Sequence, residues 1–465
     1  MSSKRFIALL IGAALLTVSA AADGLPLRDY SAMADRFAAN PCNVKDIGDP
    51  FVLPLEGGYQ VFATGGPIGF FTWRSADLKT FERSKALQKV SWASGDYWAP
   101  EVFAADGRWV MLYTVRSKAT GGLRTGIAFA DAPEGPYAET LEGPLMELGY
   151  ATIDATMTWD DEGNPYLIYV RDCSENEVSG RHESHIYGVR LKRDLTGIEG
   201  EPVLLTRPEG EWETRSGDWR WNEGPAVVKH GGKYYLFYSV NAYYMKEYSV
   251  CAAVADSPLG PYVKQANNPL LAPVEGEKGV IVSGPGHNAF FEAGGELFTA
   301  YHTHTYPLAP SGNRQLCVDR AGFHADGTAF ICGPTLAPQL RPLTDLGLVN
   351  RMAQALPEEA TALLTDGDTC VAETSKPYLW RGTEAAFRWE TPVTADLLML
   401  WPAPGEAVSG TVTVNGSLEA AFSLEAGGLP GAAVILPFEP VQVESLEIRL
   451  DQEAALGEVL LVGAE

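Results

Sequence analysis

The chain has little positive charge, few cysteines and few long hydrophobic runs. It carries 35 Lys and Arg residues against 59 Asp and Glu residues, a formal net charge of −24 over 465 residues. Proteins bind nucleic acids and anionic membranes through basic patches, so we expect no nucleic-acid and no membrane partner. The six cysteines form no Cys-x-x-Cys pair and no Cys/His cluster, which argues against a zinc or redox centre. Cys317 and Cys332 flank a hairpin-like stretch and could pair in an oxidising compartment, with buried thiols as the alternative.

A long apolar run does occur at the N-terminus. Lys4 and Arg5 precede an apolar stretch over residues 6–18, and alanines at 20–22 offer a cleavage site. The run is too short for a stable membrane span. It predicts a signal peptide over residues 1–22, and therefore a secreted or periplasmic protein.

Gly and Pro are abundant, with 48 and 31 residues, and they delimit five stretches of strand-like alternation. Each stretch starts at glycine, ends after an aromatic or apolar run, and follows another short apolar segment, a pattern that predicts a β-hairpin. The five stretches are residues 57–64, 107–114, 163–170, 231–239 and 294–302. Their regular recurrence predicts an all-β fold with radial repetition, a five-bladed β-propeller.

The chain changes character after the last hairpin. We expect the propeller over residues 23–345 and a short helical connector over residues 346–360. Residues 361–465 contain few tyrosines and many alanines, leucines and valines, and they predict a small β-sandwich. A long insert from Asp172 to Trp221 separates the third and fourth hairpins and is expected to shape the rim of the propeller funnel.

Three carboxylates stand where a repeat begins. In a propeller the start of each inner strand lines one central funnel, so Asp49, Asp154 and Glu223 are expected to meet there. Hydrolysis of a glycosidic bond needs two carboxyl groups, one of which must stay protonated near neutral pH. A third carboxylate close by helps to keep that proton, because like charges oppose a second ionisation.

The sequence around each carboxylate suggests its role. Glu223 lies between Trp221-Asn and Gly-Pro, a partly dry setting suited to a general acid. Asp49 is the candidate general base, with Asp46 as its rival. Asp154 lies in an apolar run, where an unpaired carboxylate is costly, and we assign it to tuning the pKa of Glu223.

Six further residues are candidates for substrate binding. Glu101 is expected to orient substrate or to support the funnel. Arg314 could pair with Asp154, hold a sugar hydroxyl or lie at the surface. Phe70, Trp73, Tyr97 and Trp98 are candidate sugar-stacking aromatics, although aromatic residues near hairpins are commonly core residues.

His287 opens the fifth repeat in a glycine-rich segment, Ser283-Gly-Pro-Gly-His-Asn. It is expected to point into the propeller axis, where it could hold a water molecule or an ion. No loop of oxygen ligands in the sequence demands calcium, and no organic cofactor is expected.

Taken in order, these motifs resemble glycoside hydrolase family 43, in the five-bladed propeller group of arabinanases, α-L-arabinofuranosidases and β-xylosidases. The carriers are Asp49-Pro-Phe, Trp98-Ala-Pro-Glu-Val, Ile153-Asp-Ala, Asn222-Glu-Gly-Pro, Ser283-Gly-Pro-Gly-His-Asn and Arg314. The resemblance implies Asp49 as base, Asp154 as pKa modulator and Glu223 as acid, with inversion at the anomeric carbon. It also implies that His287 lies beside a structural calcium ion (Ca2+) near the axis.

The C-terminal segment resembles a galactose-binding-like, discoidin-type sandwich. The carriers are Leu364-Thr-Asp-Gly-Asp, Pro392-Val-Thr and Gly457-Glu-Val-Leu-Leu-Val-Gly. The usual Trp after the opening Asp-Gly-Asp is absent, so sugar binding and a packing role both stay open for this region.

Together these features predict a secreted inverting glycosidase that acts on arabinose- or xylose-containing plant polysaccharides or oligosaccharides. The alternative is a carbohydrate-binding propeller with little or no hydrolytic activity, against which the three carboxylates argue. A retaining propeller of the fructan-cleaving type would carry a Cys next to the acid, where Gly224 stands. A carbohydrate substrate is the partner expected, and no particular protein partner is indicated.

Overall fold

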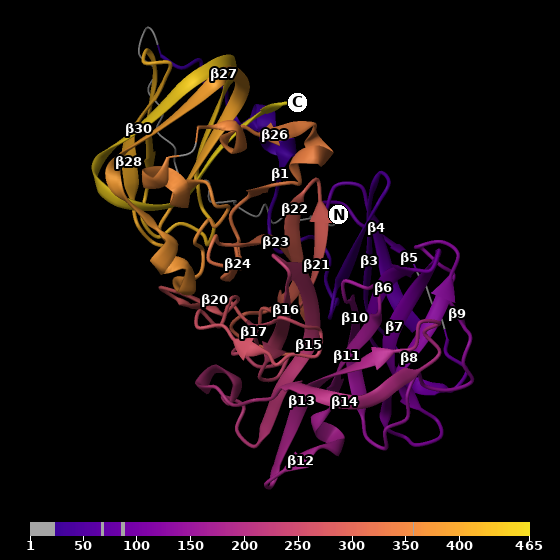
Figure 1. The fold of residues 1–465 in the computed structure, drawn as a ribbon. Helices are drawn as coiled ribbons and strands as arrows, with labels where there is room; N and C mark the ends of the chain where they lie inside the picture. The colour runs from indigo at the N-terminus through magenta and orange to yellow at the C-terminus, as the bar shows by residue number, and fades with distance from the viewer. Residues whose placement is uncertain (1–23, 67–68, 85–88, 357) are drawn as a thin grey trace, which may run out of the picture. The chain divides into compact units, whose positions relative to one another are not determined.

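The computed structural model describes residues 24–66, 69–84, 89–356 and 358–465, and the regular secondary structure of these residues is mostly β-strand (Figure 1). The predicted signal peptide lies outside these residues. Within them, the helical segments are short 3₁₀ turns, and none is long and apolar enough to cross a membrane. The chain forms two compact units, of which the larger comprises Asp35–Leu346 and Val371–Pro377.

The larger unit contains five four-stranded antiparallel blades, each made of strands in chain order (Figure 1). Blade one has β2 (Phe51–Leu55), β3 (Gly58–Gly66), β4 (Gly69–Ser75) and β5 (Glu82–Ser84). Blade two has β6 (Ala93–Ala105), β7 (Arg108–Ser117), β8 (Leu123–Ala130) and β9 (Ala138–Glu139). Blade three has β10 (Thr152–Trp159), β11 (Pro165–Arg171), β13 (Arg181–Leu191) and β14 (Ile198–Thr206).

Blade four has β15 (Trp219–His230), β16 (Lys233–Val240), β17 (Ser249–Ala255) and β18 (Val263–Lys264). Blade five has β21 (Gly286–Ala293), β22 (Glu296–His304), β23 (Arg314–Phe323) and β24 (Ala329–Ile331). The five predicted hairpins are therefore the first two strands of the five blades, and the predicted propeller is confirmed.

Five apolar clusters, one at each boundary between neighbouring blades, hold the ring together. Each draws buried side chains from two adjacent sheets, because alternate residues of a strand point to its two faces. Members from the two sides are Phe62 and Met111, Leu112 and Tyr169, Val170 and Leu236, Phe237 and Tyr301, and Phe298 and Val61. The last cluster joins blade five to blade one and so closes the ring.

The inner strand of each blade carries, within it or just before it, one residue in the left-handed backbone region, which residues other than glycine rarely adopt. The five residues are Asp49 (φ 54°), Ala99 (φ 42°), Asp154 (φ 52°), Gly224 (φ 53°) and His287 (φ 48°). In blades two to five a shift in strand register accompanies this residue. Such bulges change the direction of side chains. In three blades the left-handed residue is a predicted site residue: Asp49, Asp154 or His287.

A ring of hydrogen bonds links these five residues to the preceding blade. The N–H of Ala99 donates to Thr64 Oγ1 at 3.0 Å, and the N–H of Asp154 donates to Thr114 Oγ1 at 3.0 Å. The N–H of His287 donates to Ser239 Oγ at 2.7 Å. The acceptor is each time the last residue of the repeat recognised in the sequence.

The two remaining links of this ring differ in their acceptors. The N–H of Asp49 donates to Nδ1 of His302, at 3.3 Å, so a histidine replaces the hydroxyl in blade five. Blade three ends its repeat in Val170, which offers no acceptor. The N–H of Gly224 donates instead to Oδ2 of Asp154, at 3.1 Å.

The N-terminal segment of this unit also pairs with the last blade. Strand β1 (Phe37–Ala38) pairs with β25 (Gln339–Leu340), and Cys42 N–H donates to the Leu316 carbonyl at 2.8 Å. Between them, the buried Asn40 accepts from Val318 N–H and donates to the Val318 carbonyl, at 2.9 and 3.0 Å. A segment before blade one therefore completes the edge of blade five.

Blades three and four share a further connection. The start of β13 runs parallel to the start of β15, with His182 opposite Trp219 and Ser184 opposite Trp221. The long insert predicted between Asp172 and Trp221 thus contains two regular strands of blade three. Its additional parts are the short β12 (Glu177–Val178) and the segment between β14 and β15.

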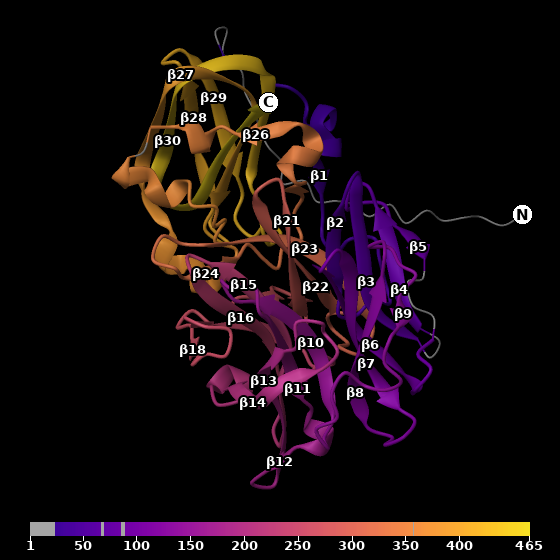
Figure 2. The same cartoon turned by 45° about the vertical axis from the view of Figure 1, so that its right-hand side comes forward.

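The smaller unit is a five-stranded β-structure, and Figure 2 shows its long strands β27 and β30. Its strands are β26 (Leu348–Asn350), β27 (Trp380–Pro402), β28 (Val408–Val414), β29 (Leu418–Leu424) and β30 (Val434–Ala464). The expected helical connector is wrong in its first part, because residues 348–350 pair with the end of β30 as a strand. The discoidin-type likeness of this unit stays a prediction.

The six cysteines are buried thiols, so the alternative without a Cys317–Cys332 bridge holds.

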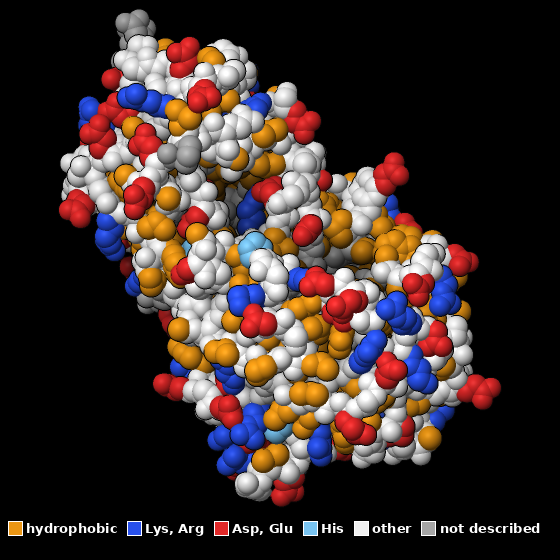
Figure 3. Space-filling view, in the orientation of Figure 1, with side chains coloured by type: hydrophobic (Ala, Val, Ile, Leu, Met, Phe, Trp, Pro, Cys, Tyr) orange, Lys and Arg blue, Asp and Glu red, His pale blue; other side chains and the backbone are white. Residues whose placement is uncertain are grey.

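On the face shown in Figure 3, acidic side chains are spread among basic and apolar ones, so the negative charge excess is not gathered there into one patch.

Candidate active site

Asp49, Asp154 and Glu223 come from blades one, three and four and are close enough for their charges to interact. Asp154 and Glu223 are 8% and 6% exposed, and the Asp49 side chain is 12% exposed. Asp46, the rival base, is exposed to solvent and lies three residues before Asp49. The described geometry therefore assembles the three carboxylates that the sequence singled out.

Asp49 is held as a carboxylate by an arginine, neighbouring histidines and a hydroxyl. Its Oδ1 lies 2.8 Å from Arg314 Nη1 and 3.1 Å from His287 Nδ1, while Thr64 Oγ1 donates to Oδ2. Burial alone would raise the pKa of this carboxyl, but Arg314, His287, His302 and the Thr64 hydrogen bond hold it well below its usual range. Asp49 is therefore ionised and ready to accept a proton.

Arg314 reaches Asp49 over a glycine. A Cβ atom at residue 48 would lie 2.1 Å from the guanidinium carbon of Arg314. Any residue other than glycine at this position would therefore displace Arg314 from its ion pair with Asp49. The sequence left three roles open for Arg314, and the described contact is with Asp49 rather than with Asp154.

Asp154 lies beside the backbone of the predicted acid. Its Oδ2 accepts a hydrogen bond from the N–H of Gly224, which is the residue directly after Glu223. Burial raises the pKa of Asp154 to about 6, with His287 opposing and the charge of Asp49 adding to this shift.

Glu223 is the carboxyl that keeps its proton. Burial and then the negative charge of Asp154 raise the pKa of Glu223 well above its usual value. Among the described residues, Tyr248 OH donates a hydrogen bond to Oε1 of Glu223 at 2.8 Å, and this bond opposes the rise in pKa. Asp49 and Glu223 are thus pushed apart in pKa, the pattern that assigns one carboxyl as base and the other as acid.

Glu101 is a fourth buried carboxyl in the same region, on β6. Burial raises the pKa of Glu101 to about 8, with a Thr156 hydrogen bond opposing and Asp154 adding. A neutral carboxyl can donate as well as accept, which suits a group that orients a sugar hydroxyl.

The four predicted stacking aromatics differ in burial. Phe70 is 0% exposed and packs edge-on against Tyr97, at 5.3 Å between ring centroids, and Trp73 is 6% exposed in the blade five–blade one core. Tyr97 is itself 2% exposed. None of these three rings has a face open to a sugar, so the stacking role expected for them does not fit their burial. Trp98 is half-buried and partly packed on the core between blades three and four.

His287 was expected near a calcium ion. Calcium takes six or more oxygen ligands, and the described residues contain no group of three or more His, Cys, Asp or Glu side chains that could hold a metal. The Nδ1 of His287 faces Asp49 directly. These residues do not supply a calcium cage, and calcium binding stays a prediction.

Three supporting residues were missed from the sequence. Thr64 and His302 contact Asp49, and Tyr248 contacts Glu223 while its ring stacks on His302, at 5.5 Å between centroids. Thr64 and His302 end the first and fifth repeats, so their equivalent positions were a signal that could have found them. Tyr248 lies in a loop with no such pattern, and Gly286 makes room for its ring.

Comparison with known proteins bears directly on this site. The model of the family described as glycosyl hydrolases family 43 matches residues 38–329. The chain is 28% identical over 319 residues to a β-D-galactofuranosidase of Aspergillus niger, covering 64% of this chain and 86% of that protein. It is 26% identical over 361 residues to an extracellular exo-α-(1→5)-L-arabinofuranosidase of Streptomyces avermitilis, covering 70% of this chain and 69% of that protein.

A solved structure supports the same relationship. A thermostable family-43 glycoside hydrolase is 41% identical, with a TM-score of 0.62, and the match covers 65% of this chain and 98% of that one. The family model, this structure and the carboxylates of the propeller agree: the chain belongs to glycosyl hydrolase family 43 and is a glycosidase that hydrolyses O-glycosyl bonds.

Proposed function

We propose that the chain is an inverting glycosidase that releases arabinose or xylose from plant polysaccharides or their oligosaccharides. The observation that carries this proposal is that two neighbouring carboxyl groups have pKa values shifted in opposite directions. Asp49 is held ionised by Arg314 and His287, whereas Glu223 is held protonated by burial and by Asp154.

In the proposed reaction, Asp49 takes a proton from a water molecule as that water attacks the anomeric carbon. Glu223 gives its proton to the glycosidic oxygen as the bond to the leaving group breaks. Asp154 keeps that proton on Glu223 beforehand, and its hydrogen bond to Gly224 N–H orients the strand that carries the acid. The product sugar then has the inverted anomeric configuration.

The sugar class rests on the relatives. Their names describe an arabinofuranosidase and a β-D-galactofuranosidase. Both names denote hydrolysis of neutral furanosides, and a neutral substrate suits a chain with a net charge of −24. The galactofuranoside is therefore tested beside the two pentosides.

The test is hydrolysis of the aryl α-L-arabinofuranoside, β-D-xyloside and β-D-galactofuranoside, together with the natural oligosaccharides. Glu223→Gln should lose activity on the oligosaccharides by about 10²–10⁴-fold. It should lose less on aryl glycosides, whose leaving groups need little protonation. Proton NMR of the first-formed anomer then tests inversion, and a retained configuration would rule out the proposed roles.

We also propose export through the predicted signal peptide at residues 1–22. One relative is described as extracellular, which supports this idea. N-terminal sequencing of the mature protein from its natural host tests it, and a mature chain that still begins at Met1 would contradict it.

A further inference from the structure

Four aromatic side chains lie next to one another on blade four, two at the start of β15 and two in the loop between β16 and β17. We call them the aromatic rim: Trp219, Trp221, Tyr243 and Tyr244. Trp219, Tyr243 and Tyr244 are 44%, 41% and 48% exposed, and Trp221 is half-buried. Adjacent exposed aromatic rings mark a binding surface more often than a solvated one.

The rim forms a continuous run of ring contacts. Trp219 and Trp221 stack at 6.3 Å between ring centroids, Trp221 meets Tyr244 edge-on at 6.4 Å, and Tyr244 meets Tyr243 at 5.4 Å. The Arg314 guanidinium then lies 4.8 Å from the Tyr243 ring centroid and bonds Asp49. One end of the rim therefore adjoins the predicted base.

The rim also adjoins the predicted acid. Trp221 lies two residues before Glu223 on β15, and such residues share one face of a strand. The acid gives its proton to the oxygen of the leaving group, so the sugar units beyond the broken bond lie on this side.

A histidine contacts each end of the rim and helps to fix its position. Trp219 stacks on His182 of β13 at 4.0 Å, within the parallel pairing that joins blades three and four. The Tyr243 carbonyl accepts from Nε2 of His304 at 2.8 Å, and a carbonyl only accepts, so Nδ1 of His304 is left to accept from Ser283 Oγ.

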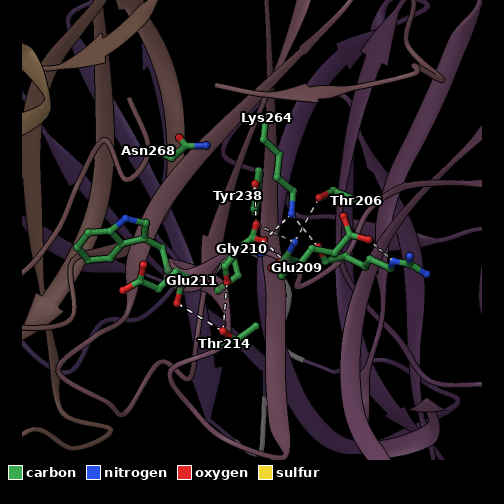
Figure 4. A network of polar contacts seen from close by, with 12 residues as sticks. Thr206, Glu209, Gly210, Glu211, Thr214, Tyr238, Lys264 and Asn268 are labelled. Atoms are coloured by element: carbon green, nitrogen blue, oxygen red, sulfur yellow. Dashed lines mark hydrogen bonds and ion pairs between the residues drawn. The ribbon is translucent and has the colours of Figure 1, made fainter. Parts of the chain in front are cut away.

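A buried polar network fixes the segment that leads into the rim (Figure 4). The carboxylate of Glu213, 3% exposed, accepts from the N–H groups of Glu209 and Gly210, at 2.9 and 2.7 Å, and from Tyr238 OH at 2.8 Å. It also pairs with Lys264 Nζ. A buried carboxylate with this many partners anchors the segment firmly to β16 and β18.

Asn241 ties that segment to the tyrosines. Its Nδ2 donates to the carbonyls of Trp212 and Glu247, at 2.8 and 3.0 Å, and its Oδ1 accepts from Arg215 N–H at 3.0 Å. The segment next to the rim is thus fixed by several hydrogen bonds. A surface that is ordered before binding loses little entropy on binding.

We propose that the aromatic rim binds the sugar units on the leaving-group side of the broken bond, so that the enzyme favours neutral oligosaccharides over single glycosides. The C–H faces of sugar rings are apolar and stack on aromatic faces, while the hydroxyls stay in water. Binding at remote units raises kcat/KM only where it is realised in the transition state. This inference rests on the proposed function, because it takes Glu223 as the acid.

The test compares Trp219→Ala and Tyr244→Ala with wild type. The substrates are tri- and tetrasaccharides of β-1,4-xylose and α-1,5-arabinose and the aryl glycosides of the same sugars. We expect the ratio of kcat/KM for the tetrasaccharide to that for the aryl glycoside to fall about tenfold in each variant, a loss of about 1.4 kcal/mol. The loss should fall mainly on KM.

Phe323→Ala is the matched control. Phe323 stacks on His230 at 4.1 Å, as Trp219 stacks on His182, but His230 is at the opposite end of β15 from the rim. This variant should keep the wild-type ratio, and thermal melting of all three variants checks that they fold.

A second measurement separates this inference from the proposed function. Calorimetry follows binding of the same tetrasaccharides to Glu223→Gln and to Glu223→Gln with Trp219→Ala. Weaker binding in the double variant supports the rim even if wild type hydrolyses neither pentoside. Unchanged substrate ratios in an active enzyme, or equal binding by both calorimetric variants, would overturn the inference while leaving the proposed function standing.

Discussion

At the scale of single residues, the site depends on which charges surround each carboxyl. Asp49 has two contacts with positive or protonatable groups within 3.1 Å, whereas Glu223 has a phenol and a neighbouring carboxylate. Sequence alone could locate both carboxyls, because each starts a repeat. The partners Thr64 and His302 end the first and fifth repeats, so their equivalent positions could have been found from the sequence. Tyr248 could not, because it lies in an irregular loop.

Asp49→Asn should lower kcat by about 10²–10⁴-fold on aryl glycosides and oligosaccharides alike, because no leaving group relieves the need for a base. Steady-state kinetics on both substrate types measures this. Asp46→Asn is the matched control, three residues away and exposed. Loss of activity in Asp46→Asn with activity kept in Asp49→Asn would reverse the assignment of the base.

The pH dependence of kcat/KM follows from the same charges. Activity requires Asp49 ionised, above its lowered pKa, and Glu223 protonated, below its raised pKa. The profile should therefore be bell-shaped, with the alkaline limb set by Glu223.

Asp154→Asn removes a negative charge that raises the pKa of Glu223. The proton on Glu223 is then lost at lower pH, so the alkaline limb should move toward acid while the acid limb changes less. The full profile of kcat/KM against pH decides this, and an alkaline limb that stays in place would contradict the role of Asp154.

At the scale of elements, the hairpins followed from the sequence, because alternation and turn residues are local signals. The burial of Phe70 did not follow, since it depends on Tyr97 from the next blade. The strand at residues 348–350 was also missed, because its partner is the end of β30, more than a hundred residues later.

The ring of hydrogen bonds allows a sharper test. Val170 stands where Thr64, Thr114 and Ser239 supply hydroxyls, and the Gly224 N–H bonds Asp154 instead. In Val170→Thr the new hydroxyl would compete for that N–H. Asp154 would then lose a hydrogen bond that lowers its pKa, and its weaker charge would move the alkaline limb of Glu223 toward acid.

The measurement is again the profile of kcat/KM against pH. Val189→Thr is the matched control, because Val189 is equally buried, at 0% exposure, in the same blade but outside the ring. Equal profiles for the two variants would show that the missing hydroxyl at residue 170 has no part in tuning the acid.

At the scale of the whole molecule, the propeller is one ring of five interlocked blades. Asn40 joins its beginning to its end through four hydrogen bonds, to Val318, Asp319 and Thr335. Asn40→Ala should lower the free energy of unfolding by about 2–4 kcal/mol, because it leaves buried polar partners unpaired.

Urea unfolding of the propeller, followed by tryptophan fluorescence, measures this loss. Asn43→Ala lies three residues away in the same segment, where Asn43 is exposed, and it should change stability little. Similar midpoints for both variants would mean that this junction does not limit stability.

The closing segment also sets an order of events during synthesis. Asn40 and Val318 are 278 residues apart, and the ribosome makes Asn40 first. Contacts this distant in the chain form slowly, and the unpaired edge of a partly made β-protein is prone to aggregation. The first residues of the propeller to emerge must therefore wait for almost the last, and a chain interrupted before blade five carries an open strand edge that is prone to aggregation.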